Sequence, residues 1–450
     1  MFSQPYKRYA ISLLLVVYTF NFVDRQILAL LMEPIKADLQ LSDTQLGFLS
    51  GIAFAVFYCT LGIPIARWAD RGNRVTIISI ALALWSAMTA LCGLATNFVQ
   101  LLLARIGVGI GEAGCSPPAH SLIADYFPRA ERSKAVSLYM MGVPLGILGG
   151  YLVGGWVSQF YGWRIAFMVV GVPGVLLALL VKLTLREPVR GQSDGIATDN
   201  QTQPRLREVF SILLQQRSLV HMVAGITLAT FAGIGAMQWI PSYYIRIHDM
   251  TTGELGTWLA FVTGIGGLVG VYLGGFFTHR FGADDERIQA RILAISTALM
   301  PLVLFVALQW SDARISLLCL FFFNLLYFFY YGPSFSLVQG LANIKIRALT
   351  IAIVMFVQNL IGAGLGPQSV GLISDALTPS FGAQSLQIAI LINSLVALWA
   401  AVHFWLAGRA IHADIRAAQG IHNNDQLSGL SSTPEPFLSG AETIILDAEK

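Results

Sequence analysis

Apolar stretches long enough to cross a lipid bilayer recur along almost the whole chain, separated by short charged or Gly- and Pro-containing turns. A helix needs about 20 predominantly apolar residues to span the hydrocarbon core of a membrane. The composition agrees with such spans, since 55% of the 450 residues are hydrophobic and only 12% are charged. The sequence therefore predicts an all-α polytopic membrane protein.

Apolar length and the spacing of polar turns predict twelve transmembrane helices. Because this number is even, both termini are expected on the same side of the membrane. The helices are expected near residues 9–34, 43–68, 75–96, 98–124, 133–158, 164–185, 218–245, 253–278, 288–309, 313–340, 347–374 and 384–410.

The longest internal polar connection, residues 186–217, divides the chain into two bundles of six helices, 1–185 and 218–410. Its later part, LREVFSILLQQ, has the pattern of a short amphipathic helix lying on the membrane surface. The tail, 411–450, is polar, and we expect it to be mostly disordered. Gly-rich segments at corresponding positions, GILGGYLVGGWVSQFYG and IGAGLGPQSVGLISDAL, indicate pseudo-symmetric halves with a site between them.

Basic residues are distributed unequally between the two sides of the membrane. Most lysines and arginines of the polar turns fall on the side of the termini, whereas the other side has Lys36, Arg164, Arg246 and Arg314. Cytoplasmic loops are enriched in Lys and Arg, so both termini are expected in the cytoplasm. The small net charge of +3, without a basic run interleaved with aromatic residues, argues against a nucleic-acid partner. The four cysteines lie in apolar segments without metal-ligand spacing, and no metal or other cofactor is expected.

Four charged residues stand out because they lie away from the ends of the predicted spans: Asp24, Arg25, Arg105 and Glu112. A charge at the bilayer centre costs at least ~2.5 to 3.5 kcal/mol on insertion scales, so each of them requires an explanation. Arg105 and Glu112 are seven positions apart and therefore share one face of a helix. Asn21 shares a face with Asp24 and Arg25 through the three- and four-residue spacings. Because Asp24 and Arg25 are about 100° apart around the helix axis, they need not pair with each other.

Two interpretations of these charges remain open. They can be structural ion pairs that hold the first and fourth spans together. Alternatively they line a water-accessible pathway, in which Arg25 and Arg105 bind an anionic group while Asp24 and Glu112 take up and release protons. Buried ion pairs add little stability, because desolvation cancels much of their attraction. Four charges on two helices therefore favour the pathway, with Asn21 as a further substrate contact.

A second polar constellation, ARWADRGNR, lies between the second and third spans. A positively charged loop on the cytoplasmic side explains Arg71 and Arg74, but it does not explain Asp70. An acid at a helix end can hold nearby basic residues or cap a facing helix. Asp70, Arg71 and Arg74 are therefore candidates for a cytoplasmic gate.

Spans seven to twelve have neutral polar groups where the first half has charges. Their candidates for substrate contact are Gln238, Tyr331, Gln358 and Asn359. A cavity between the halves would have one charged wall and one mostly apolar and aromatic wall, which suits a ligand with an ionic head and a hydrocarbon tail. Packing of the apolar half against lipid explains the same pattern equally well.

Several of these motifs resemble those of the major facilitator superfamily. DRGNR resembles its conserved loop, RIGVGIGEAG its fourth-helix Arg motif and MGVPLGILGG its fifth-helix Gly/Pro motif. Within that superfamily, NFVDRQ, RIGVGIGEAGCSPPAHSLIADYFP, ERSKAVSLY and REPVRG look like the spinster family of lysosphingolipid and lysophospholipid transporters. The resemblance weakens beyond residue 190, where His279 stands in place of the expected acid of the second-half loop. The short tails suggest a bacterial member, and hence a location in the cell inner membrane.

The resemblance implies transport by alternating access, with the intramembrane charges in binding or coupling and the DRGNR loop in the gate. The expected function is proton-coupled secondary active transport of an amphipathic anionic lipid, such as a lysophospholipid or a sphingosine-1-phosphate-like molecule. We expect the proton gradient as driving force and a monomer surrounded by membrane lipids. A small organic anion is the alternative substrate, and a non-transporting membrane sensor is a less favoured alternative. No spacing of nucleophile, base and orienting residue indicates an enzyme.

Overall fold

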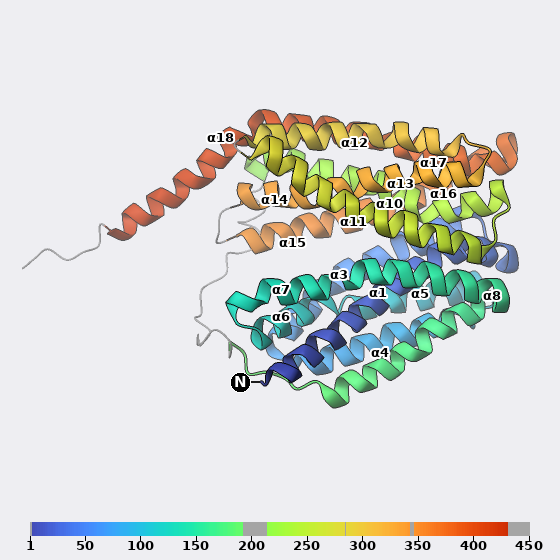
Figure 1. Ribbon diagram of the computed structural model, residues 1–450, viewed down its shortest axis with the longest axis horizontal. Helices are drawn as coiled ribbons and strands as arrows, with labels where there is room; N and C mark the ends of the chain where they lie inside the picture. The colour runs from blue at the N-terminus through green and yellow to red at the C-terminus, as the bar shows by residue number, and fades with distance from the viewer. Residues whose placement is uncertain (1, 192–213, 284, 343–345, 431–450) are drawn as a thin grey trace, which may run out of the picture.

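The computed structural model is built of helices joined by short turns (Figure 1). No strand occurs among the residues that the structure describes, which are 2–191, 214–283, 285–342 and 346–430. Ten helical stretches of this described part are long and apolar enough to cross a membrane. The expected all-α polytopic architecture is therefore confirmed.

Two of the ten stretches are too long for a single crossing. They contain 55 residues from Ala130 to Thr184 and 68 residues from Leu349 to Arg416. About 20 helical residues already cover the ~30 Å of a membrane core. The first stretch reverses direction at Gly162 (φ 84°) and the second at Gly382 (φ 54°). Glycine adopts these positive φ angles without strain, which allows a reversal at each position. Each of the two therefore crosses twice, and the described residues make the twelve crossings that the sequence predicts.

The N-terminal half contains helices α1 to α8 (Figure 1). Its five apolar stretches make six crossings, because Ala130–Thr184 crosses twice. Short breaks divide some of the crossings into two helices, and α8 contains the reversal at Gly162. The bounds are α1 Gln4–Leu39, α2 Asp43–Ser50, α3 Ile52–Arg71, α4 Arg74–Cys92, α5 Phe98–Glu112, α6 Ser116–Tyr126, α7 Arg129–Met140 and α8 Gly142–Thr184.

The C-terminal half also makes six crossings, and its eleventh crossing contains a π-helical segment, η1. A short 3-10 turn, η2, follows at the second reversal. The bounds are α10 Arg217–His248, α11 Thr252–Gly282, α12 Glu286–Leu308, α13 Ala313–Phe329, α14 Tyr331–Leu341, α15 Arg347–Val357, η1 Gln358–Ala363, α16 Gly364–Phe381, η2 Gly382–Gln384, α17 Ser385–Ser394 and α18 Val396–Leu430.

The last helix requires one correction to the expected domain limits. α18 continues to Leu430, so residues 411–430 are helical where the sequence predicts disorder. The segment RAIHADIRAA, directly after the last apolar turn, is rich in alanine and arginine, whose high helix propensity favours continuation of the helix beyond the membrane. Residues 431–450 and most of the predicted amphipathic helix LREVFSILLQQ lie outside the described residues.

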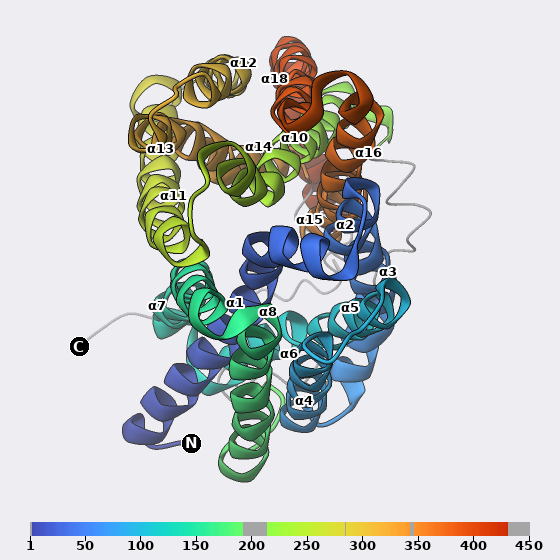
Figure 2. The same ribbon diagram turned by 90° about the vertical axis from the view of Figure 1, so that its right-hand side faces the viewer.

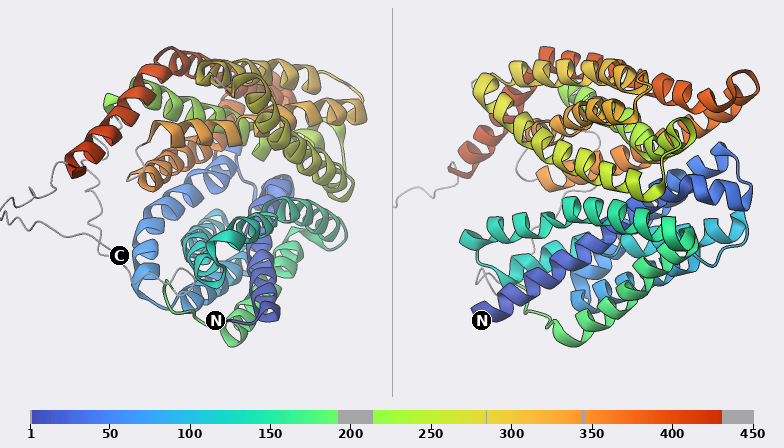
Figure 3. Two further views of the ribbon diagram at one scale, coloured as in Figure 1. Left: turned by 60° about the vertical axis from the view of Figure 1, so that its left-hand side comes forward. Right: turned by 45° about the vertical axis from the view of Figure 1, so that its right-hand side comes forward.

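The two halves lie side by side as separate bundles (Figures 1 and 3). The N-terminus and the outer end of α18 lie at the same end of the molecule, which we call the terminal face. The opposite end is the distal face. There the halves meet, with α2 packed against α16 and α8 packed against α11 (Figure 2).

Two glycines allow this close approach at the distal face. A Cβ on Gly51, between α2 and α3, would lie 2.2 Å from the carbonyl oxygen of Gly364 in the other half. A Cβ on Gly155 of α8 would lie 2.5 Å from the carbonyl oxygen of Thr252 of α11. Any side chain at either position would push the halves apart, because small residues are what lets helix backbones come this close.

Candidate functional site

A buried ion pair joins α1 to α5 within the N-terminal half. Nε of Arg25 donates a hydrogen bond to Oε2 of Glu112 at 2.7 Å. The Glu112 side chain is fully buried, whereas 26% of the Arg25 side chain is exposed. Of the adjacent residues Asp24 and Arg25, it is therefore Arg25 that reaches the acid of the neighbouring helix.

Aromatic rings surround the guanidinium group of Arg25. Its Cζ lies 5.1 Å from the ring centre of Phe22, 5.0 Å from that of Phe54 and 4.9 Å from that of Tyr58. The negative faces of rings at such distances attract a cation with an energy of about 0.5 to 2 kcal/mol. We call these three residues the aromatic cage. The cage is not among the features predicted from the sequence, although the four-residue spacing of Phe54 and Tyr58 places both on one face of α3.

Asp24 and Arg105 are buried beside this pair, with 1% and 2% of their surfaces exposed. The charged neighbours of Asp24 include Glu112 and Arg105. Two buried polar atoms here, Nε and Nη1 of Arg105, make no hydrogen bond, whereas Asp24 interacts with Thr89 and Glu112 with Asn21. Buried polar atoms are ordinarily hydrogen-bonded, so a cluster of this kind is suited to hold a ligand, water or a transferable proton. The four intramembrane charges and Asn21 lie together in it.

Tyr331 and Gln358 of the C-terminal half face this cluster from the other side. Nε2 of Gln358 donates a hydrogen bond to the hydroxyl of Tyr331 at 3.3 Å. Tyr331 in turn interacts electrostatically with Arg25 and Tyr58 across the boundary between the halves. Gln358 is also the first residue of η1, and π-helical turns are frequent at functional sites.

The other two predicted substrate contacts are not joined to the cluster. Asn359 donates from Nδ2 to the carbonyl oxygen of Met355, one turn back on its own helix, at 2.8 Å. Gln238 is half-buried on α10. Within the described part of the chain, no hydrogen bond connects Asn359 or Gln238 to Arg25 or Glu112.

The three residues predicted to form a cytoplasmic gate lie in different environments. Arg74 is 1% exposed, and its Nε binds Glu187 at 2.6 Å while its Nη1 binds Asp125. Asp70 and Arg71 are exposed at the end of α3, and neither forms an ion pair with any described residue. In this conformation Arg74 acts inside the N-terminal half and does not bridge the two halves.

The REPVRG segment, residues 186–191, is bound to the same network. Oε2 of Glu187 accepts a hydrogen bond from the backbone N–H of Val75 at 3.0 Å. Nη2 of Arg190 donates to the carbonyl oxygens of Ala69 and Gly72, each at 2.7 Å. The start of the connection between the halves is therefore fastened to the terminal face of the N-terminal half.

An ionic network that is not predicted from the sequence joins the halves at the distal face. Arg246, near the end of α10, donates to Glu33 at 2.7 Å and to the two oxygens of Asp43 at 2.7 and 2.6 Å. Lys36 also pairs with Asp43 at 2.6 Å. The carboxylate of Asp375 on α16 accepts a hydrogen bond from the backbone N–H of Asp43 at 3.0 Å. We call Glu33, Asp43, Arg246 and Asp375 the distal lock.

Hydrogen bonds between the halves lie toward the distal face, apart from one weak contact near the middle of the molecule. Besides the distal lock, they include contacts of α8 with α11, such as the backbone N–H of Gly253 donating to Oε1 of Gln159 at 2.9 Å. A weak contact from Sγ of Cys59 to the carbonyl oxygen of Phe356, at 4.0 Å, lies near the middle of α3. Among the described residues none joins the halves at the terminal face. The two bundles are therefore closed against each other at the distal face alone.

Two six-helix bundles that enclose buried charges and close against each other at one end define a membrane transporter of the two-half type. The sequence profile of the Major Facilitator Superfamily matches residues 14–367. The chain belongs to this superfamily, and it is a multi-pass membrane transporter rather than an enzyme.

Three curated relatives show which members of the superfamily the chain is similar to. An MFS-type efflux pump of Mycolicibacterium smegmatis is 34% identical over 90% of this chain and 94% of its own length. The cis,cis-muconate transport protein of Acinetobacter baylyi is 27% identical over 78% of this chain and 84% of its own. The sphingosine-1-phosphate transporter SPNS2 of Danio rerio is 27% identical over 81% of this chain and 76% of its own.

A solved structure of a bacterial homolog to the human lysosomal transporter spinster has the same fold. It is 30% identical, with a TM-score of 0.85, over 92% of this chain and 99% of that one. That structure is inward-facing and unoccupied. The resemblance to the spinster family that the motifs indicate is therefore confirmed.

Proposed function

We propose that the protein is a proton-coupled secondary active transporter of an amphipathic, lipid-like anionic substrate, such as a lysophospholipid or a sphingosine-1-phosphate-like molecule. It works by alternating access of the two halves, driven by a proton gradient, in the cell inner membrane with both termini in the cytoplasm. The excess of Lys and Arg on the terminal side supports this orientation. Both walls of the site come from one chain, which supports a monomer as the working unit.

The ion pair between Arg25 and Glu112 carries this proposal. Glu112 neutralises Arg25 as long as it is ionised. An anionic head group that binds Arg25 competes with Glu112 and leaves that carboxylate free to take up a proton. Protonation of Glu112 in turn releases Arg25 to the anion, since linkage between two ligands is reciprocal. Substrate and proton occupancy are thereby coupled at one pair of side chains.

Asp24 and Arg105 extend the same chemistry. Arg105 offers a second cation to the head group, and Asp24 offers a second carboxyl for proton transfer. Support for these roles is the burial of both side chains, together with the two nitrogens of Arg105 that make no hydrogen bond in this conformation.

The different character of the two walls supports a lipid-like substrate. The N-terminal half offers the charge of Arg25 together with the ring surface of the aromatic cage. The C-terminal half contributes the neutral Tyr331 and Gln358. A molecule with an anionic head and a hydrocarbon tail matches both, and the relative SPNS2 is a sphingosine-1-phosphate transporter.

Closure at the distal face alone supports alternating access. The distal lock holds one end of the halves together while the terminal end has no described bond between them. Breaking the lock while forming contacts at the terminal face would expose the same site to the other side of the membrane.

The proposal is tested with purified protein in proteoliposomes under an imposed pH gradient. The substrate panel contains lysophospholipids, sphingosine-1-phosphate, cis,cis-muconate and sugar acids. We expect uptake of the lysolipids that depends on the gradient, and a Glu112→Gln variant that binds lysolipid without responding to the gradient. Glu254→Gln is the control, because Glu254 is an exposed acid at the distal start of α11. Gradient-independent uptake, or unchanged coupling in Glu112→Gln, would overturn the assigned role.

A small organic anion is the second candidate substrate. The observation in its favour is the similarity to the cis,cis-muconate transport protein, together with two arginines in one buried cluster. Selective uptake of muconate or sugar acids in the same panel, without lysolipid uptake, would establish this alternative and exclude the lipid-like substrate.

A further inference from the structure

A pocket of about 300 Å³ lies near the terminal end of the C-terminal half. It is lined by Arg287 and Arg291 of α12 and by Trp405, Gly408 and Arg409 of α18. Figures 1 and 2 place α12 and α18 on the side of this half that is remote from the N-terminal half. The pocket is therefore separate from the site between the halves.

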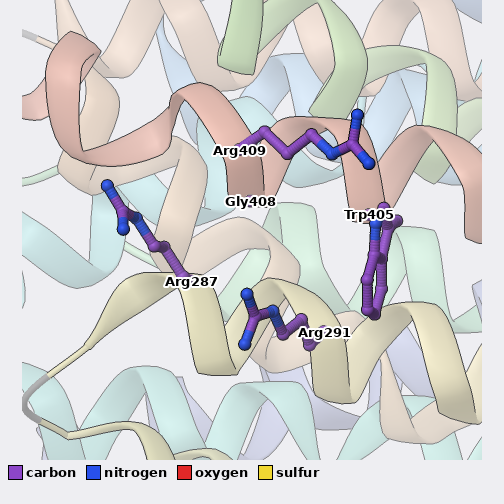
Figure 4. A pocket seen from close by; sticks show the side chains of 5 residues that line it. All are labelled: Arg287, Arg291, Trp405, Gly408 and Arg409. Carbon is purple, nitrogen blue, oxygen red and sulfur yellow. The ribbon is translucent and has the colours of Figure 1, made fainter.

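The two helices approach closely at the floor of the pocket. A Cβ on Gly408 would lie 3.2 Å from Cβ of Ala290 and 3.5 Å from the carbonyl oxygen of Arg287. Figure 4 shows Arg287 and Arg291 on α12, Trp405 reaching from α18 toward α12, and Arg409 lying along α18. Cationic side chains from both helices therefore border the same hollow.

Among the described residues, no acidic side chain forms an ion pair with an arginine of the pocket, whether Arg287, Arg291 or Arg409. Cζ of Arg291 lies 5.4 Å from the ring centre of Trp405, which orients that guanidinium beside the indole. All three arginines are exposed, so their charge is available to a ligand.

The acidic residues nearby are already engaged. Nε2 of His412 lies 2.9 Å from Oδ1 of Asp285 and 3.2 Å from Oε2 of Glu286. The backbone N–H of Arg287 donates to Asp285 at 2.8 Å and holds the pKa of that carboxyl below its usual range. An ionised Asp285 offsets part of the charge of Arg287. Arg291 and Arg409 are therefore the cations most available to an external anion.

Below the arginines, the two helices continue toward the membrane interior with exposed apolar side chains. On α12 these follow Arg291 at intervals of three and four residues, and on α18 they precede Trp405 in the same way, so each set stays on one helix face. They are Ile295, Leu299 and Leu302 of α12, and Val402, Trp399 and Leu398 of α18. A cationic pocket thus stands at the end of an apolar surface that faces lipid.

We propose that this pocket binds the phosphate-bearing head group of an anionic phospholipid whose acyl chains lie along the apolar faces of α12 and α18. Guanidinium groups bind phosphate through paired hydrogen bonds, and tryptophan is favoured where head groups meet acyl chains. A basic loop that only sets topology needs no pocket between helices and no tryptophan within it. The apolar continuation favours a membrane lipid over a free phosphate.

The test uses the full-length protein purified in detergent and compares the double variant Arg291→Gln/Arg409→Gln with wild type. Retention of added phosphatidylglycerol is measured by native mass spectrometry, and thermal stability is measured with the same lipid. We expect the double variant to bind phosphatidylglycerol on the order of tenfold more weakly, given the contribution of each basic residue near an anionic lipid surface. Arg280→Gln is the matched control, because Arg280 is an exposed arginine of α11 at the same face but outside the pocket.

Further arms separate the sources of the anion. Phosphatidylcholine tests the need for net negative charge, and inorganic phosphate tests whether the head group alone suffices. Equal retention of phosphatidylglycerol by wild type and the double variant, equal binding of phosphatidylcholine, or equal stabilisation by inorganic phosphate would each overturn the proposal. Arg291→Lys/Arg409→Lys keeps the charge without the forked donor, and we expect it to fall between wild type and the Gln variant.

Discussion

Arg246 and Asp43 are 203 positions apart in the chain, yet Nη1 and Nη2 of the arginine donate to the two carboxylate oxygens of the aspartate at 2.7 and 2.6 Å. This two-pronged contact has the geometry in which an arginine binds a carboxylate most strongly. Because Asp43 begins α2 and Arg246 lies near the end of α10, it ties one half to the other at the distal face. Separation of the halves there requires it to break.

Replacing Arg246 with Gln is expected to shift the protein toward a conformation that is open at the distal face. Removal of Arg246 takes away the cation that Glu33 contacts and leaves Asp43 paired with Lys36 alone, and breaking a buried ion pair costs up to about 3 to 5 kcal/mol. Full inversion of a 1:99 population takes about 5.5 kcal/mol, so a shift of up to about 3 to 5 kcal/mol raises the fraction of open molecules many-fold without completing the inversion. Gln40 and Asp249 are exposed on opposite halves of this face and can each carry a spin label. Double electron–electron resonance should therefore report a longer distance between the two labels in the variant.

Arg164→Gln is the matched control for this experiment. Arg164 pairs with Asp38 near the same face, but both residues belong to the N-terminal half. An unchanged distance distribution in Arg246→Gln, or an equal change in Arg164→Gln, would show that the distal lock does not hold the halves together.

Gly51→Ala is expected to oppose closure of the distal face by steric means. The new Cβ would lie 2.2 Å from the carbonyl oxygen of Gly364, a backbone atom that cannot move away without shifting its helix. The same label pair should again report a longer distance, together with reduced transport. Gly275→Ala is the control, since a Cβ at Gly275 meets nothing within 4 Å. Normal closure in Gly51→Ala would mean that the helices rearrange to accept the methyl group.

Loss of one ring from the aromatic cage is expected to weaken substrate binding without abolishing it. Tyr58→Leu removes a ring centred 4.9 Å from Cζ of Arg25 while keeping an apolar side chain. A cation–ring contact of about 0.5 to 2 kcal/mol corresponds to roughly 2- to 30-fold in affinity. Titration of thermal stability with a lysolipid measures the change. Tyr272→Leu, at an exposed tyrosine of α11, should leave affinity as in wild type.

Arg74→Gln is expected to destabilise the N-terminal half, whereas Arg71→Gln is not. Arg74 is buried and holds the half-buried Glu187 and Asp125, so its loss leaves two acids without this partner at a cost of up to about 3 to 5 kcal/mol. Arg71 is exposed, and surface substitutions usually change stability by less than about 0.5 kcal/mol. Thermal unfolding in detergent should show Tm lowered by several degrees for Arg74→Gln alone. Equal Tm values for both variants would contradict the structural role of Arg74.

The membrane explains why so much of the fold is predictable from sequence. A crossing demands a minimum apolar length, so the spans can be read from apolar runs, and a charge inside a span is costly enough to draw attention. That cost identified Arg25 and Glu112 as site candidates. Their pairing with each other could not be deduced, because angular spacing along α1 shows only that Asp24 and Arg25 point in different directions.

Charged residues at helix ends cannot be recognised in the sequence in the way that charges inside a span can. Arg246 and Lys36 look like ordinary topogenic residues in the sequence, because a charge at the membrane surface costs little. The distal lock depends on pairing with Asp43, which is 203 positions from Arg246, and no local pattern encodes such a distance. The sequence likewise does not show that Arg74 is buried. Its burial depends on the later REPVRG segment, which folds back onto α4 and α6, so Arg74 is predicted as part of a gate.

The π-helical segment η1 divides the eleventh crossing into two helical parts that can change orientation relative to each other. On one side of it, α16 is fastened to α2 through Asp375 of the distal lock; on the other side, α15 runs toward the terminal face. A π-helical turn has about one residue more than an α-helical turn, which offsets the faces of the two parts by about 100°. Conversion of η1 to α-helix would turn α15 about its own axis and draw it along that axis by about 1.5 Å. In the eleventh crossing, α15 can therefore rotate and shift along its axis while α16 stays bound to α2.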